Sequence, residues 1–167
     1  MIDQSPLATA TRIAEAFSVP TELLDQLQRL HQVQWELEDE TRRRDATPRA
    51  VAAAKGRIDA CNAIRHRLID AMDSAVEDIT IGAMPRLYSE TIGELCDRLL
   101  ILDLKQHALA RTSSSEADRV SRVCAHLAQL ANQLVTDLAA GRAGLPPRAG
   151  VKIYAADQPA STQVVLR

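Results

Sequence analysis

Aromatic residues are scarce in this chain of 167 residues, in which Phe, Trp and Tyr together make up 2%. β-Sandwiches and β-barrels depend on aromatic and β-branched residues, so the composition argues against both. Long apolar runs are also missing, because no stretch approaches the roughly eighteen residues of a membrane span. The N-terminus lacks the basic and then apolar segments of a secretory signal. We therefore expect a cytoplasmic protein that makes no contact with a membrane.

Neither sign of charge dominates, because 20 Lys and Arg are balanced by 22 Asp and Glu, for a net charge of −2. A balanced chain has no long-range field of one sign, so we expect no sequence-independent binding to nucleic acid. Cysteine is rare, and Cys61, Cys96 and Cys124 are far apart and odd in number. This spacing argues against disulfides and against a cysteine zinc site, and it predicts small buried side chains.

Helix-forming residues dominate what remains, and the hydrophobic content of 46% is enough for a core. Caps and periodicity predict an all-α antiparallel bundle of four long helices and a short N-terminal one. The expected helices are residues 6–17, 21–44, 48–74, 92–110 and 116–140. We expect one domain over residues 1–141 and a Gly- and Pro-rich tail over residues 142–167. The β-prone pieces 151–154 and 164–166 predict a small hairpin or packing of the tail on the bundle.

The 92–110 helix is apolar nearly all round, which predicts a central position in the bundle. Thr91-Ile92-Gly93-Glu94 reads as a capping box at its start. The 116–140 helix has a clean apolar stripe instead, formed by Val120, Val123, Leu127, Leu130, Leu134 and Leu138.

Polar residues interrupt the inward face of the 21–44 helix halfway along its length. Leucine forms this face first, at Leu23, Leu24, Leu27 and Leu30. At the same helical spacing the face continues as His31, Gln34, Glu38 and Arg42, with Trp35 at its edge.

The next two helices show the same change of character. In the 48–74 helix, Asn62 and Arg65 lie within the apolar stripe, and Lys55 and Asp59 flank it. The stripe itself is formed by Val51, Ile58, Ile69 and Met72. In the 92–110 helix, Glu94, Arg98 and Lys105 follow one line, with Asp97 beside it.

Burying these polar groups costs several kcal/mol unless partners satisfy them. One interpretation is a closed network of ion pairs and hydrogen bonds that fixes helix register. The other is an open polar pocket between the helices that a ligand completes, since bundle interiors commonly hold ligand sites.

The polar positions also carry a family resemblance, in three segments. They are His31-x-x-x-Trp35-x-x-Glu38-Asp39-x-x-Arg42, Lys55-x-x-Ile58-Asp59-x-x-Asn62-x-x-Arg65 and Ser89-Glu90-Thr91-Ile92-Gly93-Glu94-Leu95-x-Asp97-Arg98-Leu99-x-Ile101-Leu102-x-Leu104-Lys105. The chain resembles a bacterial domain family of unknown function, which usually has Pro where Ile92 stands. Members of that family often lie beside glycosyltransferase genes, so the resemblance implies a role near glycoconjugate or glycosylated-metabolite synthesis. It carries over no catalytic residue.

The first functional hypothesis is an enzyme or binding protein for a small anionic metabolite, such as a phosphorylated sugar or a nucleotide sugar. Arg42, Arg65, Arg98 and Lys105 would hold its phosphate or carboxylate oxygens. Glu38 or Asp59 would act as general base, and His31 would titrate near neutrality. Trp35, Lys55, Asn62 and Asp97 complete the expected binding residues. The free N–H groups at Ser89–Gly93 offer a further anion contact. No metal ligand is predicted, and the sequence identifies no cofactor.

Two alternatives remain open. The first is a non-catalytic accessory subunit of a glycosyltransferase, docking through an apolar patch on the first helix, the last helix or the tail. Self-association as a homodimer is a further expectation. The second is a magnesium-dependent nucleotide pyrophosphohydrolase that uses acidic residues of the 21–44 and 48–74 helices. These residues are Glu36, Asp39, Glu40, Asp70 and Asp73.

Overall fold

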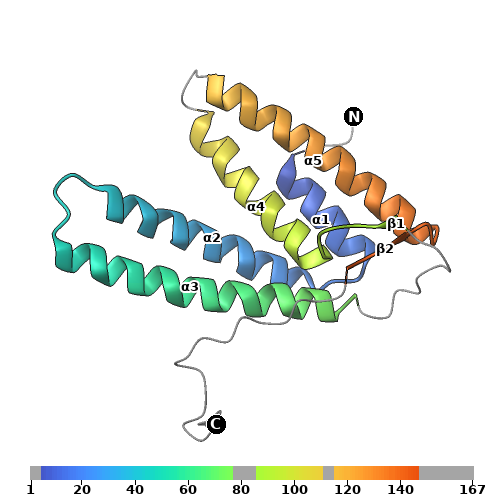
Figure 1. The fold of residues 1–167 in the computed structure, drawn as a ribbon, viewed down its shortest axis with the longest axis horizontal. Coiled ribbons are helices and arrows are strands. Elements are labelled where there is room, and N and C mark those ends of the chain that lie inside the picture. The colour runs from blue at the N-terminus through green and yellow to red at the C-terminus, as the bar shows by residue number, and fades with distance from the viewer. Residues whose placement is uncertain (1–4, 77–85, 111–114, 147–167) are drawn as a thin grey trace, which may run out of the picture.

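The computed structural model describes residues 5–76, 86–110 and 115–146, and this part of the chain is almost entirely helical. Its helices are α1 (Pro6–Ala16), α2 (Thr21–Arg42), α3 (Pro48–Ser74), α4 (Ile92–Leu109) and α5 (Ser115–Ala139). Two short strands, β1 (Arg86–Leu87) and β2 (Ala143–Gly144), form a parallel pair (Figure 1). The predicted all-α bundle is confirmed, and the predicted helix ends agree with the structure to within two residues.

Side-chain caps begin most of these helices. Ser5 accepts a bond from Ala8 N (3.2 Å), and Thr47 accepts one from Ala50 N (3.2 Å). At α4 the predicted capping box is complete, because Thr91 N donates to Glu94 Oε2 (2.9 Å) and Glu94 N donates to Thr91 Oγ1 (3.2 Å). Such caps pair N–H groups that the helix itself leaves unbonded. At α2 the N-cap is Pro20, without a side-chain bond.

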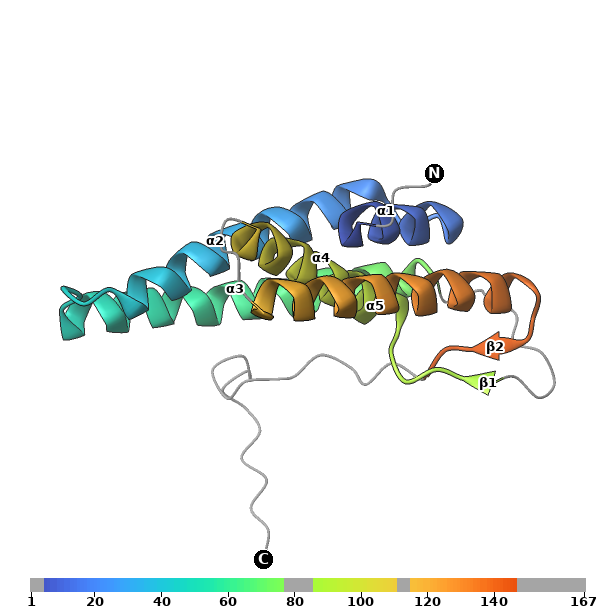
Figure 2. The same ribbon diagram turned by 90° about the horizontal axis from the view of Figure 1, so that it is seen from above.

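The helix α4 lies at the centre of the bundle and packs against α1, α2, α3 and α5. In Figure 2, α1 lies on one side of α4 and α5 lies on the other. The buried face of α4 comprises Ile92, Leu95, Cys96, Leu99 and Leu100. The central position that the sequence predicts for this helix is therefore confirmed.

The helices α2 and α3 form a long antiparallel hairpin whose turn extends beyond the other helices (Figure 1). This outer part of the hairpin has its own small core of Leu37, Ala54, Ile58 and Cys61. All three cysteines are buried as free thiols, as predicted. None of the helices in the described ranges has the length and hydropathy needed to cross a bilayer.

The apolar stripe predicted for the last helix is confirmed at four buried positions, Val120, Leu127, Leu134 and Leu138, and is wrong at Val123 and Leu130. Val123 and Leu130 are 42% and 47% exposed, whereas Cys124, Ala128 and Ala131 are buried. Small side chains allow helix backbones to approach closely, so α5 turns these positions inward and its larger neighbours outward. The sequence analysis favoured large apolar side chains and therefore assigned Val123 and Leu130 to the buried face in place of the small residues.

The segment after α5 folds back onto the bundle. Gly141 has φ of +65°, a left-handed conformation that suits glycine at a helix end. Tyr88 N then donates to Gly144 O (3.0 Å) beside the β1–β2 pair. Asp137 is 7% exposed and anchors this region, because it accepts bonds from Tyr88 Oη (3.3 Å) and Arg142 Nη2 (2.8 Å). The predicted hairpin of residues 151–154 and 164–166 lies outside the described residues.

Candidate functional site

Three helices meet at the carboxylate of Asp97. Arg65 on α3 donates from Nε to Oδ1 (2.7 Å) and from Nη2 to Oδ2 (2.5 Å). His31 on α2 contacts Oδ1 through Nε2 at 2.9 Å. Asp97 itself lies on α4, and both it and His31 are only 5% exposed. The inward polar residues of three predicted helices therefore form one buried cluster.

This cluster keeps Asp97 ionised. Burial alone raises the pKa of a carboxyl group, but the bonds from Arg65 and His31 outweigh burial and hold the pKa of Asp97 below its usual value. The same bond to Asp97 raises the pKa of Arg65. Two oxygens of an ionised carboxylate act only as acceptors, so the bonded Nε2 of His31 carries the proton. In the neutral form of an imidazole bonded in this way the lone pair is on the other nitrogen, and Nδ1 of His31 makes no hydrogen bond to any described residue.

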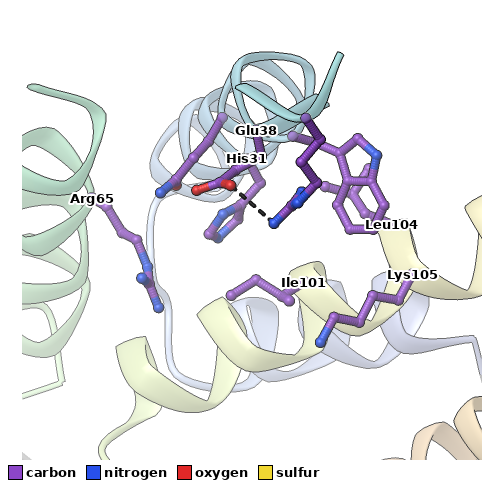
Figure 3. Close-up of a pocket in the computed structure, with 9 residues that line it drawn as sticks. His31, Glu38, Arg65, Ile101, Leu104 and Lys105 are labelled. Atoms are coloured by element: carbon purple, nitrogen blue, oxygen red, sulfur yellow. Dashed lines mark ion pairs between the residues drawn. The ribbon is translucent and has the colours of Figure 1, made fainter. Parts of the chain in front are cut away.

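A groove opens beside the cluster, between α2, α3 and α4, with a volume of about 310 Å³ (Figure 3). Its residues are His31, Gln34, Trp35, Glu38, Arg42, Arg65, Ile101, Leu104 and Lys105. In Figure 3, Arg65 reaches in from α3 and Lys105 lies on α4. Trp35, Ile101 and Leu104 supply its apolar surface. We call this space the main groove.

The predicted residues of α2 do line the main groove. Glu38 and Arg42 form the expected i, i+4 ion pair at 3.0 Å, although the Arg42 side chain is 69% exposed. Trp35 also lies at the surface of the molecule, at 36% exposure. Arg42 is therefore a rim residue rather than an inward one.

The predicted residues of α3 divide into two groups. Arg65 lines the groove, whereas the Oδ1 of Asn62 accepts a bond from Gln34 Nε2 at 2.8 Å and so joins α2 to α3. Lys55 and Asp59 are exposed, and they line neither the main groove nor the second hollow that is described next. Each follows a buried residue, Ala54 or Ile58, by one position, and one position turns a helical side chain by about 100°. The expectation that Lys55 and Asp59 belong to the site is therefore corrected.

A second hollow of about 490 Å³ shares Arg65, Ile101 and Lys105 with the main groove. Its residues are Arg65, Ser89, Glu90, Glu94, Asp97, Arg98, Ile101, Leu102, Lys105 and Val123. Arg98, predicted as an anion ligand, pairs here with Glu90 at 2.9 Å. We call this space the side hollow.

The N–H groups at the start of α4 are already used by protein acceptors. Gly93 N donates to Asp73 Oδ1 (2.6 Å), and Thr91 and Glu94 satisfy each other. These backbone N–H groups are therefore not free for the anion contact that was predicted at Ser89–Gly93. Asp73 has a capping role here, and the described residues contain no cluster of three metal-ligating side chains.

The sequence did not point to Ile101 and Leu104 as site residues, because apolar positions on a central helix read as core. The sequence also did not show that Asp97, predicted as a binding residue, holds His31 and Arg65 with its carboxylate while it lines the side hollow. Only the crossing of three helices shows this.

The structure thus defines an all-α bundle protein with a partly apolar, basic-rimmed groove next to a buried His–Asp–Arg cluster. The chain belongs to the family described as protein of unknown function (DUF4254), whose profile matches residues 21–146. This match confirms the family resemblance, and the groove residues all lie within the matched range. No curated protein and no solved structure matches the chain.

Proposed function

We propose that the main groove binds a small anionic metabolite, such as a phosphorylated sugar or a nucleotide sugar. One observation carries this proposal. Two cations from different helices, Arg65 on α3 and Lys105 on α4, line the same groove beside the apolar surface of Ile101 and Leu104. Lys105 makes no ion pair within the described ranges of the chain. Among the groove residues, Arg42, Arg65 and Lys105 outnumber the single carboxylate of Glu38.

The ion pair with Asp97 prepares Arg65 for binding. Two of its nitrogens are held by Asp97, so its guanidinium group has one orientation, while Nη1 has no bond to a described residue. A donor that is already ordered loses less entropy when a ligand arrives. Guanidinium groups also match phosphate and carboxylate oxygens in geometry.

The His31–Asp97 pair supports an enzymatic role for the groove. An ionised Asp97 fixes the tautomer of His31, and the free Nδ1 would accept a proton from a bound substrate. We place this activity in glycoconjugate or natural-product biosynthesis, following the family resemblance. Three buried free thiols suit a reducing compartment, so we propose that the protein acts in the cytoplasm.

A calorimetric titration with pyrophosphate and glucose 1-phosphate tests the binding proposal. Lys105→Ala should weaken binding at least fivefold, because it removes an exposed cation without disturbing the buried cluster. Lys55→Ala is the matched control, since Lys55 is an exposed lysine outside the groove. Equal affinities for wild type, Lys105→Ala and Lys55→Ala, or no binding by wild type, would reject the groove as an anion site.

A second candidate function is an accessory subunit of a glycosyltransferase. The exposed Val123 and Leu130 on α5 favour it, because they give that helix an apolar surface without a partner in the described structure. Analytical size exclusion with a candidate glycosyltransferase tests it. Co-elution that is lost in the Val123→Gln, Leu130→Gln double variant would support docking through α5, and separate elution at micromolar concentrations would count against it.

A further inference from the structure

The main groove and the side hollow share Arg65, Ile101 and Lys105, so the two hollows adjoin at the same two cations. We propose that they form one continuous site for a nucleoside diphosphate that carries a hydroxylated group. The diphosphate would lie at Arg65 and Lys105, with the base beside Trp35 and the hydroxylated group beside Glu90 and Glu94. This inference rests on the proposed function and specifies its substrate class.

The apolar lining of the main groove suits the base of the ligand. Trp35, Leu104 and Ile101 present apolar surface there. A planar aromatic ring buries well against such a surface, and an exposed tryptophan face is a stacking platform for any nucleobase.

The centre of the combined site suits the diphosphate of the ligand. Arg65 and Lys105 are the two cations that line both hollows. Arg65 is oriented by Asp97, and the N–H groups of Thr91, Gly93 and Glu94 are engaged by protein oxygens. The anionic part of a ligand therefore finds its donors between the hollows rather than at the start of α4.

The side hollow suits neutral hydroxyl groups rather than phosphate. It contains the carboxylates of Glu90 and Glu94, and the charge of Arg98 is matched by Glu90 at 2.9 Å. Carboxylates at this end would repel a further phosphate but accept bonds from hydroxyl groups. The Ser89 hydroxyl adds a group that both donates and accepts. A neutral group with several hydroxyls, such as a hexose, fits this end of the site.

Calorimetric titration with graded ligands tests the inference. The series consists of pyrophosphate, the diphosphates UDP, ADP and GDP, and the conjugates UDP-glucose, ADP-glucose and GDP-mannose. We expect one diphosphate to bind at least fivefold more tightly than pyrophosphate, and its sugar conjugate to bind at least threefold more tightly again. No gain from any sugar, or none from any base, overturns the bipartite site while the anion-binding proposal stands. Absence of binding by every member, pyrophosphate included, rejects both proposals.

Two variants separate the ends of the site. Trp35→Ala should reduce the gain from the base and leave pyrophosphate binding unchanged. Glu90→Gln should reduce the gain from the sugar and leave diphosphate binding unchanged. Glu116→Gln is the matched control, because Glu116 also pairs with an exposed arginine, Arg119, at 2.6 Å but lies on α5. If Glu90→Gln and Glu116→Gln give the same gain from the sugar as wild type, the side hollow does not hold the sugar.

Discussion

Arg65 and Asp97 form a two-bonded ion pair that joins α3 to α4, and the same Asp97 carboxylate holds His31 on α2. One carboxylate thus connects the three helices around the main groove. The network that one sequence interpretation predicts is present here, and a groove lies beside it. The network lies behind the groove and orients the side chains that face it.

Removing the Asp97 charge should destabilise the protein strongly. Asp97→Asn leaves Arg65 without its carboxylate partner and turns one acceptor oxygen into a donor. Breaking a buried pair in this way typically costs about 3 kcal/mol of unfolding free energy. Urea denaturation followed by circular dichroism measures the change. Asp59→Asn, at an exposed position, should change stability by less than about 0.5 kcal/mol. Equal stability of both variants would show that Asp97 does not hold the helices together.

Two glycines in helices should respond to alanine in opposite directions. A Cβ atom at Gly93 would lie 2.6 Å from Ile69 O and 2.9 Å from Asp73 Oδ1, so α4 would have to move away from α3. We expect Gly93→Ala to lower the unfolding free energy by about 1–3 kcal/mol, the usual cost of overpacking. At Gly56 nothing lies within 4 Å of an added Cβ. Gly56→Ala should therefore raise stability by up to about 1 kcal/mol, because alanine favours helix. Thermal unfolding of both variants measures the contrast. A Gly93→Ala protein as stable as wild type would contradict the close contact between α3 and α4.

Stability should fall in acid partly through Asp97. Its pKa is lowered in the folded protein despite burial, because Arg65 and His31 bond its ionised form. A lowered folded pKa contributes stability above the unfolded value of about 3.9, and this contribution is lost as the pH falls below that value. Unfolding free energies of wild type and Asp97→Asn should therefore converge on acidification from pH 5 downward. Asp59→Asn should follow wild type throughout, and a constant difference between wild type and Asp97→Asn would contradict the ionised state of Asp97.

The thiol of Cys96 should be inert in the folded protein. Burial, with Asp73 and Asp97 nearby, raises its pKa to about 12. The thiolate is the reactive species, so iodoacetamide at pH 8 should leave Cys96 unmodified. Mass spectrometry after digestion reads this out, with urea-unfolded protein as the positive control. An exposed cysteine introduced by Ser121→Cys should react fully in the folded state. Rapid alkylation of native Cys96 would mean that α4 is not buried.

Much of the architecture follows from local chemistry. Ser5, Thr47 and the Thr91–Glu94 capping box are read directly from the sequence, because a helix start depends on bonds within a few residues. The apolar residues that lie nearly all round the helix of residues 92–109 likewise predict the central position of α4. Two positions of α5 were misjudged, because the buried face depends on how closely helices approach each other. The predicted stripe included Val123 and Leu130, whereas the packed face has Cys124, Ala128 and Ala131 beside the correctly predicted Val120, Leu127, Leu134 and Leu138.

The amino-acid sequence alone determined the helices, the scarcity of other elements and the presence of polar residues on apolar faces. Local spacing carries that information, since each helix is built from contacts within one turn. Only the tertiary structure decided which polar residues meet. It brought His31, Arg65 and Asp97 together from three helices and left Lys55 and Asp59 in solvent. Those outcomes depend on the crossing of helices far apart in the chain, which no single helical period encodes.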